Sequence, residues 1–134
     1  MSSRFTSAPA KIVSSHAARQ FFSPWFSWNA DNRELLCALH VDEAGRCLRL
    51  MQYHGDRAHV RFPLSEIIVD VIECSTSGLI IAHNHPSGDA TPSGSDCRAT
   101  RRLAALSEAL GCTVRDHLIF AGPKAISFRE CGLL

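Results

Sequence analysis

The sequence has no excess charge of one sign and no long hydrophobic run. Its 134 residues carry 14 basic and 13 acidic side chains, which gives a formal net charge of +1. A charge this small provides no long-range attraction to a phosphate backbone, so nucleic-acid binding would require a local basic patch. No apolar run approaches the ~20 residues of a membrane span, and residues 1–15 lack the apolar core of a secretory signal. We therefore expect a cytoplasmic protein without membrane attachment.

The sequence also lacks any Cys-x-x-Cys pair, which excludes the usual spacing of a zinc knuckle or a thioredoxin-like centre. A chain of this length that is 46% hydrophobic can bury a core without disulfides, and the cytoplasm is reducing. We expect the cysteines to be thiols that pack as small hydrophobic residues. They are Cys37, Cys47, Cys74, Cys97, Cys112 and Cys131.

Residues 1–28 are expected to form an N-terminal extension with a short helix, and residues 29–134 the main domain. The helix is predicted over residues 14–22, because the Ser23-Pro24 pair should end it. The aromatic side chains nearby lack interleaved Lys or Arg, which favours packing against a sheet over stacking on bases. These aromatic residues are Phe21, Phe22, Trp25, Phe26 and Trp28.

The remaining pattern predicts a domain with two helices and several short strands. One helix is expected from Pro63, with Asp70 on its polar face, and another from Ser93 to a stop at Gly111. The second helix should bury one apolar face, formed by Ala99, Leu103, Leu106 and Leu110. Strands are expected over residues 34–42, 46–53, 58–62, 79–82, 112–120 and 124–128, the first three as an antiparallel meander.

The stretch from His83 to Asp96 carries the most chemical information. Histidines at i and i+2 on extended backbone project to the same side, so the rings of His83 and His85 can converge on one ion. A helix that begins at Ser93 places Asp96 in its first turn, where the carboxylate can supply a third ligand. Three protein ligands leave the fourth position of zinc for water, as in catalytic sites. Taken alone, Ser93 is also an ordinary N-cap and Asp96 a carboxylate favoured by the helix dipole.

The order His-x-His, seven residues, Ser, two residues, Asp resembles the signature of the JAMM metallopeptidases, also called JAB or MPN-plus domains. The match is residue for residue at His83, His85, Ser93 and Asp96. The longer run HNHPSGD, the TPS that follows it and the later Asp116-His117-Leu-Ile are similar to the RadC family. This resemblance extends over about residues 29–134, and its fixed residue types make it specific.

The resemblance implies an α/β domain of the α+β type with a cytidine-deaminase-like JAB fold, in which helices flank a mixed central sheet. From the same resemblance we expect one Zn²⁺ per chain, bound by His83, His85 and Asp96. It also implies a catalytic glutamate from an earlier strand, best matched here by Glu34, and an oxyanion donor at Ser93. Spacing alone does not distinguish that glutamate from three others, Glu43, Glu66 and Glu73. The expected function is zinc-dependent hydrolysis of peptide or isopeptide bonds, although affinity order alone does not separate zinc from other divalent ions.

The sequence supports less specific predictions for Asn84, Asp116 and His117. Asp116 and His117 either orient the metal ligands or are a strand carboxylate and a partly buried histidine. Asn84 projects away from its two histidine neighbours, and we expect it to hydrogen-bond within the loop rather than to bind the metal.

The expected partner is a protein or peptide substrate, including ubiquitin-like conjugates, because many JAMM members cleave bonds to such modifiers. The alternative is a non-catalytic RadC-like interaction module in DNA repair or recombination. About thirty residues precede the matching region, too few for the helix-hairpin-helix segment common in RadC-like proteins, which weakens the case for DNA binding. Arg98, Arg101 and Arg102 are interpreted as a solvated helix face, and the sequence does not indicate an oligomeric state.

Overall fold

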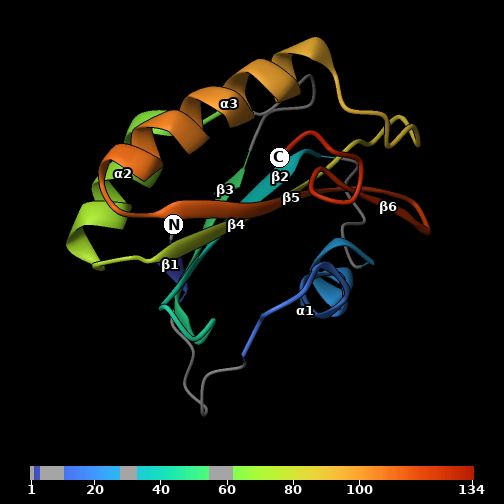
Figure 1. The fold of residues 1–134 in the computed structure, drawn as a ribbon. Helices are drawn as coiled ribbons and strands as arrows, with labels where there is room; N and C mark the ends of the chain where they lie inside the picture. The colour runs from blue at the N-terminus through green and yellow to red at the C-terminus, as the bar shows by residue number, and fades with distance from the viewer. Residues whose placement is uncertain (1, 4–10, 28–32, 55–61) are drawn as a thin grey trace.

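The computed structural model describes residues 2–3, 11–27, 33–54 and 62–134. Within these residues the chain forms a six-stranded sheet with the strand order β1-β3-β2-β4-β5-β6 (Figure 1). Strands β4 and β5 run parallel, and the other neighbouring pairs are antiparallel, so the sheet is mixed as predicted. The strands are β1 (Ser2–Ser3), β2 (Leu35–Val41), β3 (Cys47–His54), β4 (Gly78–Asn84), β5 (Thr113–Ala121) and β6 (Lys124–Ser127).

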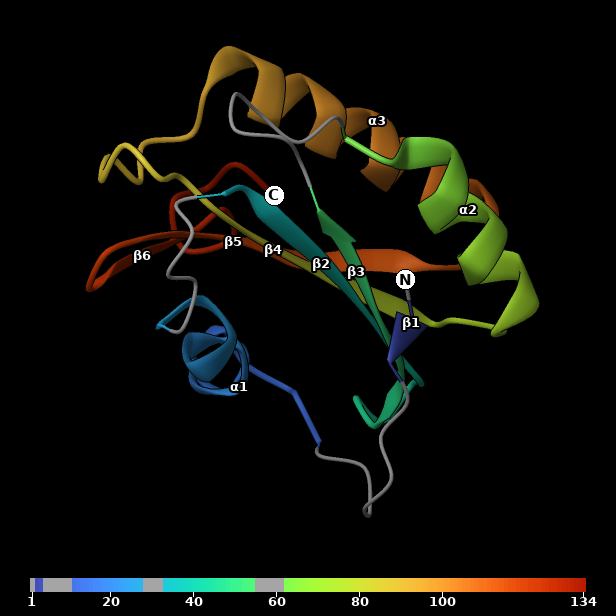
Figure 2. The same cartoon turned by 180° about the vertical axis from the view of Figure 1, so that it is seen from behind.

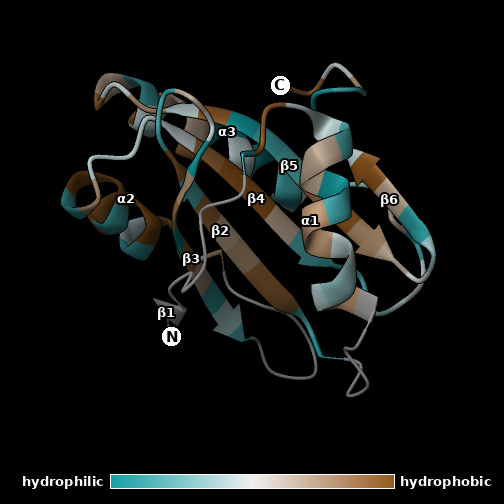
Figure 3. Ribbon diagram, turned by 90° about the horizontal axis from the view of Figure 1, so that it is seen from below, coloured by the Kyte–Doolittle hydropathy of each residue, from teal (hydrophilic) through white to brown (hydrophobic). Residues whose placement is uncertain are grey.

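Helices cover both faces of the sheet. Those in the described residues are α1 (Ser15–Ser27), α2 (Leu64–Glu73) and α3 (Gly94–Ala109). Helices α2 and α3 lie over one face and α1 over the other (Figures 1 and 2). Alternate residues of β2 enter two separate cores, with Leu36 under α2 and α3 and Cys37 under α1. Burial on both faces explains the continuous apolar sequence of the central strands, which Figure 3 shows in brown.

Helix α1 continues through Pro24, where the sequence predicted that it would end. An interior proline costs a helix ~3 kcal/mol, but the side chains on either side of this one pack against the sheet. Phe22 is fully buried, and Phe26 stacks on Phe120 of β5 with ring centroids 4.7 Å apart. This packing outweighs the local penalty and agrees with the role expected for the aromatic cluster, although Trp28 lies outside the described residues.

The strand predicted over 58–62 and the domain boundary predicted between residues 28 and 29 also fall almost wholly outside the described residues. The other predicted strands appear with shifts of one to two residues at their ends. Pro63 is the residue before α2 rather than its first helical residue. Gly111 follows α3 with a φ of 76°, a conformation that favours glycine, and it ends the helix as predicted.

Helix α3 buries a different face from the one that its apolar residues predicted. Leu103 is buried, but Leu106 and Leu110 are 46% and 45% exposed. Thr100 and Ser107 are buried in their place. Thr100 faces inward because its hydroxyl hydrogen-bonds to a histidine of β5, a contact that helical periodicity does not reveal.

Helix α2 buries Asp70, which was expected on its exposed face. The carboxylate accepts hydrogen bonds from Arg49 Nη1 at 3.5 Å and from the Tyr53 hydroxyl at 3.2 Å. A buried carboxylate requires such partners, and here both come from β3. The prediction was wrong because these partners are distant in sequence.

The cysteines agree in part with the expectation. All six are thiols, and Cys37, Cys47 and Cys112 are buried, whereas Cys131 is exposed. Burial raises the pKa of the Cys37 thiol to about 12, so this side chain stays neutral and packs as a hydrophobic residue.

Two features of the described residues concern binding to nucleic acids and to membranes. Arg98, Arg101 and Arg102 are all exposed on α3, as expected for a solvated helix face. Across the described ranges, no helix combines the length and apolar character needed to cross a membrane.

The imidazole of His40 makes the fold sensitive to acid. The ring is fully buried on β2, and its Nδ1 lies 2.8 Å from Thr76 Oγ1. Burial lowers the pKa of His40 to about 4, against a smaller opposing effect of Asp70. Protonation places hydrogens on both ring nitrogens, and Nε2 has no hydrogen-bond partner among the described residues. The folded protein therefore binds a proton at this ring less readily than the unfolded chain does.

We expect the free energy of unfolding to fall as the pH drops from about 6.5, the pKa of an unperturbed histidine, to about 4. In this range the unfolded chain binds more protons, and the contribution of His40 is about 3 kcal/mol. Denaturant titrations of the metal-free protein across this range measure the effect. A His40→Asn variant, which keeps a polar partner for Thr76, should lose less stability in acid than the parent. An equal loss in both proteins would contradict the prediction.

Candidate metal centre

The end of β4 and the first turn of α3 meet at one end of the sheet. His83 lies near the end of β4, His85 directly follows the strand, and Asp96 lies in the first turn of α3. The Nε2 atoms of the two histidines are 3.0 Å apart, and the Asp96 carboxylate lies 3.2 Å from His85 Nε2 and 3.5 Å from His83 Nε2. The structure thus brings together the three residues predicted as metal ligands, a group able to hold a metal ion.

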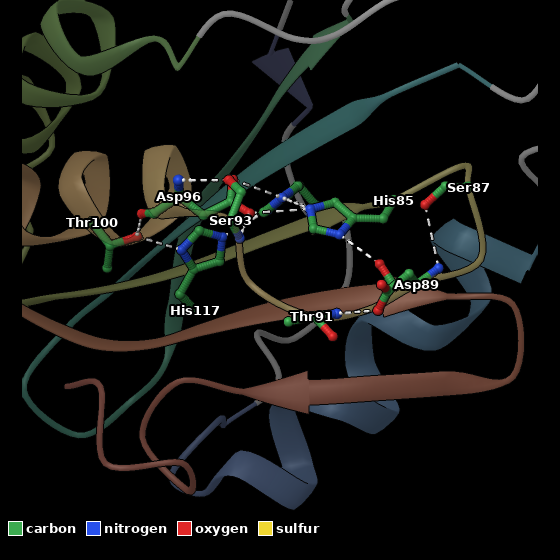
Figure 4. Close-up of polar contacts among 9 residues, drawn as sticks. His85, Ser87, Asp89, Thr91, Ser93, Asp96, Thr100 and His117 are labelled. Atoms are coloured by element: carbon green, nitrogen blue, oxygen red, sulfur yellow. Dashed lines mark hydrogen bonds and ion pairs between the residues drawn. The ribbon is translucent and has the colours of Figure 1, made fainter.

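A reciprocal pair of hydrogen bonds holds Asp96 in place. The Ser93 backbone N–H donates to Asp96 Oδ2 at 2.8 Å, and the Asp96 N–H donates to Ser93 Oγ at 3.0 Å. This capping box shows that the N-cap interpretation of Ser93 is correct, and it directs the Asp96 carboxylate toward the histidines (Figure 4). Because the Ser93 oxygen accepts this hydrogen bond, its O–H hydrogen remains available to donate.

The loop after β4 determines which nitrogen of His85 faces Asp96. His85 Nδ1 lies 2.8 Å from the backbone carbonyl of Asp89, which can only accept, so the ring hydrogen is on Nδ1 (Figure 4). Asp89 in turn accepts from the Thr91 N–H at 3.0 Å and holds the loop. In the neutral ring of His85 the lone pair is therefore on Nε2, which faces the Asp96 carboxylate.

A longer chain of hydrogen bonds sets the tautomer of His83. The Thr100 hydroxyl donates to the Asp96 backbone carbonyl at 2.7 Å, so its oxygen accepts from His117 Nδ1, also at 2.7 Å. Burial, aided by the neighbouring His83, lowers the pKa of His117 well below its ordinary value and keeps the ring neutral. Its Nε2 therefore accepts from His83 Nδ1 at 2.7 Å. In the neutral ring of His83, Nε2 is therefore left with a lone pair, which faces His85.

These contacts fit a cation. In these neutral tautomers, two ring nitrogens without hydrogens lie 3.0 Å apart beside a carboxylate, and two facing lone pairs repel unless a positive charge lies near both. Burial raises the pKa of Asp96, but its interactions with His83 and Ser93 outweigh this effect and hold that pKa well below its usual range. The carboxylate is therefore ionised, and the two-nitrogen, one-carboxylate set is one that zinc accepts.

Glu34 shares a cavity with these ligands. The cavity has a volume of about 330 Å³. Of the four glutamates that spacing left open, all in the described part of the chain, Glu34 is the one that lines it. Ser93 lines the same cavity, together with the hydrophobic residues Leu36, Phe62 and Ala99.

The structure separates the roles of the two neighbouring candidates on β5. His117 contacts the ligand His83 and stacks on Phe128, with ring centroids 4.4 Å apart. Asp116 instead accepts hydrogen bonds from the hydroxyls of Ser15 and Ser127 and from the His117 N–H. It is a buried carboxylate that joins α1 to β5 and β6, and its described contact with His117 is to the backbone N–H and not to the ring.

Thr100, which hydrogen-bonds to both Asp96 and His117, was not among the site residues predicted from the sequence. The only available sequence signal was its position four residues after Asp96, on the helix face that also carries Leu103.

The chain is a mixed α/β domain that carries two histidines at a strand end and an aspartate in the first turn of the following helix. These features place it in the class of candidate metal-binding domains. The family model of the RadC-like JAB domain matches residues 12–133, so the match includes α1. The chain belongs to this family.

Several curated relatives are named UPF0758 proteins. The chain is 45% identical to one from Ruegeria pomeroyi over 83 residues, which are 62% of this chain and 37% of the relative. It is 37% identical to one from Aquifex aeolicus over 105 residues, or 78% of this chain and 46% of the relative. The chain therefore spans less than half the length of these relatives.

Proposed function

We propose that this domain is a zinc-dependent hydrolase of peptide or isopeptide bonds. The observation that carries the proposal is the arrangement of His83 and His85, whose Nε2 atoms lie 3.5 Å and 3.2 Å from the Asp96 carboxylate. Three such ligands leave room for water at a fourth position, which distinguishes catalytic from structural zinc sites. A potential base, Glu34, lines the same cavity.

The proposed mechanism assigns one task to each residue. Zinc bound by His83, His85 and Asp96 would lower the pKa of water from 15.7 to about 7 and polarise the substrate carbonyl. Glu34 accepts a proton from the attacking water and delivers it to the leaving amine, so the carboxylate is regenerated. Ser93 donates its available O–H to the oxyanion of the tetrahedral intermediate.

The substrate class follows from this chemistry and from the family resemblance. Amide hydrolysis requires a carbonyl to polarise and an amine to protonate, which a peptide or a lysine-linked conjugate of a ubiquitin-like protein supplies. A non-catalytic interaction module in DNA repair remains the alternative. A scaffold requires neither a base in the metal cavity nor a donor at Ser93, so the residues present favour hydrolysis.

Metal removal tests the proposal. We expect zinc-loaded protein to cleave members of a panel of peptides and lysine-linked isopeptides, to lose this activity on chelation, and to regain it with about one equivalent of zinc per chain. Circular dichroism of the chelated protein checks that the fold is retained. Protein that binds one zinc but cleaves none of the panel would favour the interaction module, and cleavage unaffected by chelation would exclude the zinc mechanism.

A further inference from the structure

Asn84 connects the metal ligands to the proposed base. It is the last residue of β4 and lies between His83 and His85. Its side-chain Oδ1 accepts from the Leu35 N–H at 2.7 Å, and its Nδ2 donates to the Arg33 carbonyl at 3.0 Å. These two backbone groups belong to the peptide units on either side of Glu34.

The register of the sheet explains why a side chain makes these contacts. The pairing of β2 with β4 ends at Leu36 and His83. Beyond it, β4 continues to pair with β5, and the His85 N–H donates to the Phe120 carbonyl at 2.8 Å. A carboxamide has the donor and acceptor of a peptide group, so Asn84 extends the ladder past its last backbone pair.

We infer that Asn84 is a positioning residue for Glu34, an inference that rests on the proposed hydrolase function. The two hydrogen bonds hold both peptide units next to the Glu34 Cα and therefore set the direction of its Cα–Cβ bond. Asn84 is covalently joined to both histidine ligands, so the base and the ligands are held in one frame without an intervening loop. Such fixed geometry matters because a displacement of about 1 Å can cost a reaction about 100-fold.

Two substitutions separate positioning from folding. Asn84→Ala removes both hydrogen bonds, whereas Asn84→Asp keeps the shape and the acceptor for Leu35 but places an oxygen against the Arg33 carbonyl. We expect both variants to bind one zinc per chain and to show kcat lowered by about 10- to 100-fold with KM nearly unchanged. Ser87→Ala, in the exposed loop that follows β4, is the matched control and should retain the parental kcat.

Two further measurements test whether Asn84 acts through Glu34. In a Glu34→Gln background, Asn84→Ala should lower kcat no further, because a positioning residue acts only through the group it positions. Hydrogen exchange of the Leu35 amide should accelerate in the Asn84→Ala variant independently of any activity.

Parental kcat in both Asn84 variants, or a full additional loss of kcat in the Glu34→Gln background, would overturn the positioning role and leave the hydrolase intact. Zinc-loaded parent protein without hydrolysis would overturn the proposed function, and this inference with it. Unchanged Leu35 exchange would show that the Asn84 amide does not hold this segment in solution.

Discussion

Replacing Asp96 with asparagine is expected to abolish tight zinc binding while the protein stays folded. The variant lacks the ionised carboxylate, whose Oδ1 faces His83 Nε2 and whose Oδ2 faces His85 Nε2, but its amide oxygen can still accept from the Ser93 N–H and preserve the helix cap. Loss of a residue that hydrogen-bonds to a metal ligand typically costs about 10- to 100-fold in metal affinity. Loss of the charge of a ligand itself should therefore cost more than about 100-fold. Competition against a chromophoric chelator measures the change.

Asp89→Asn is the matched control for this experiment. It removes one negative charge from the same loop, but the contact of Asp89 with His85 uses the backbone carbonyl and not the carboxylate. This variant should keep one zinc per chain at parental affinity. Parental affinity in Asp96→Asn would exclude Asp96 as a ligand, and equal losses in both variants would indicate an effect of net charge alone.

Replacing Glu34 with glutamine is expected to lower kcat by about 10²- to 10⁴-fold, the usual contribution of a general acid–base group. Glutamine has nearly the same size as glutamate but does not accept the proton of the attacking water. Zinc content should remain at one per chain, because Glu34 is not among the three proposed ligands, which come from β4, the residue after it and α3. Steady-state hydrolysis of the best substrate, together with elemental analysis of the same samples, measures both quantities.

Glu73→Gln is the corresponding control, since Glu73 is exposed at the end of α2 and does not line the cavity. It should retain the parental kcat. Full zinc-dependent hydrolysis by Glu34→Gln would show that another group is the base. Loss of zinc together with activity would instead make Glu34 part of the metal site.

The clustering of the three candidate metal ligands was predictable from the sequence because they are local. His83, His85 and Asp96 lie within fourteen residues, and the strand and helix that carry them have clear hydrophobic patterns. Glu34 lies 49 residues before His83, and only the register that pairs Leu36 with His83 brings it into the same cavity. Spacing alone therefore did not separate it from the other glutamates.

The errors of the sequence analysis have the same origin. The continuation of α1 through Pro24 depends on Phe26 stacking against Phe120, which is 94 residues away. The inward orientation of Thr100 depends on His117 of β5, and the burial of Asp70 depends on two residues of β3. Each outcome depends on tertiary contacts, and these override local propensity.

The short sequence separation of the three candidate ligands also affects the order in which the metal site and the sheet form during folding. Contacts between residues close in sequence tend to form early, whereas strand pairing between distant segments carries a larger entropic cost. A chain in which the turn from β4 to α3 has formed already holds all three ligands, while Glu34 still requires β2 to pair with β4. In the proposed hydrolase, metal capture can thus precede completion of the sheet, so a newly made chain would be able to hold zinc before it could cleave amide bonds.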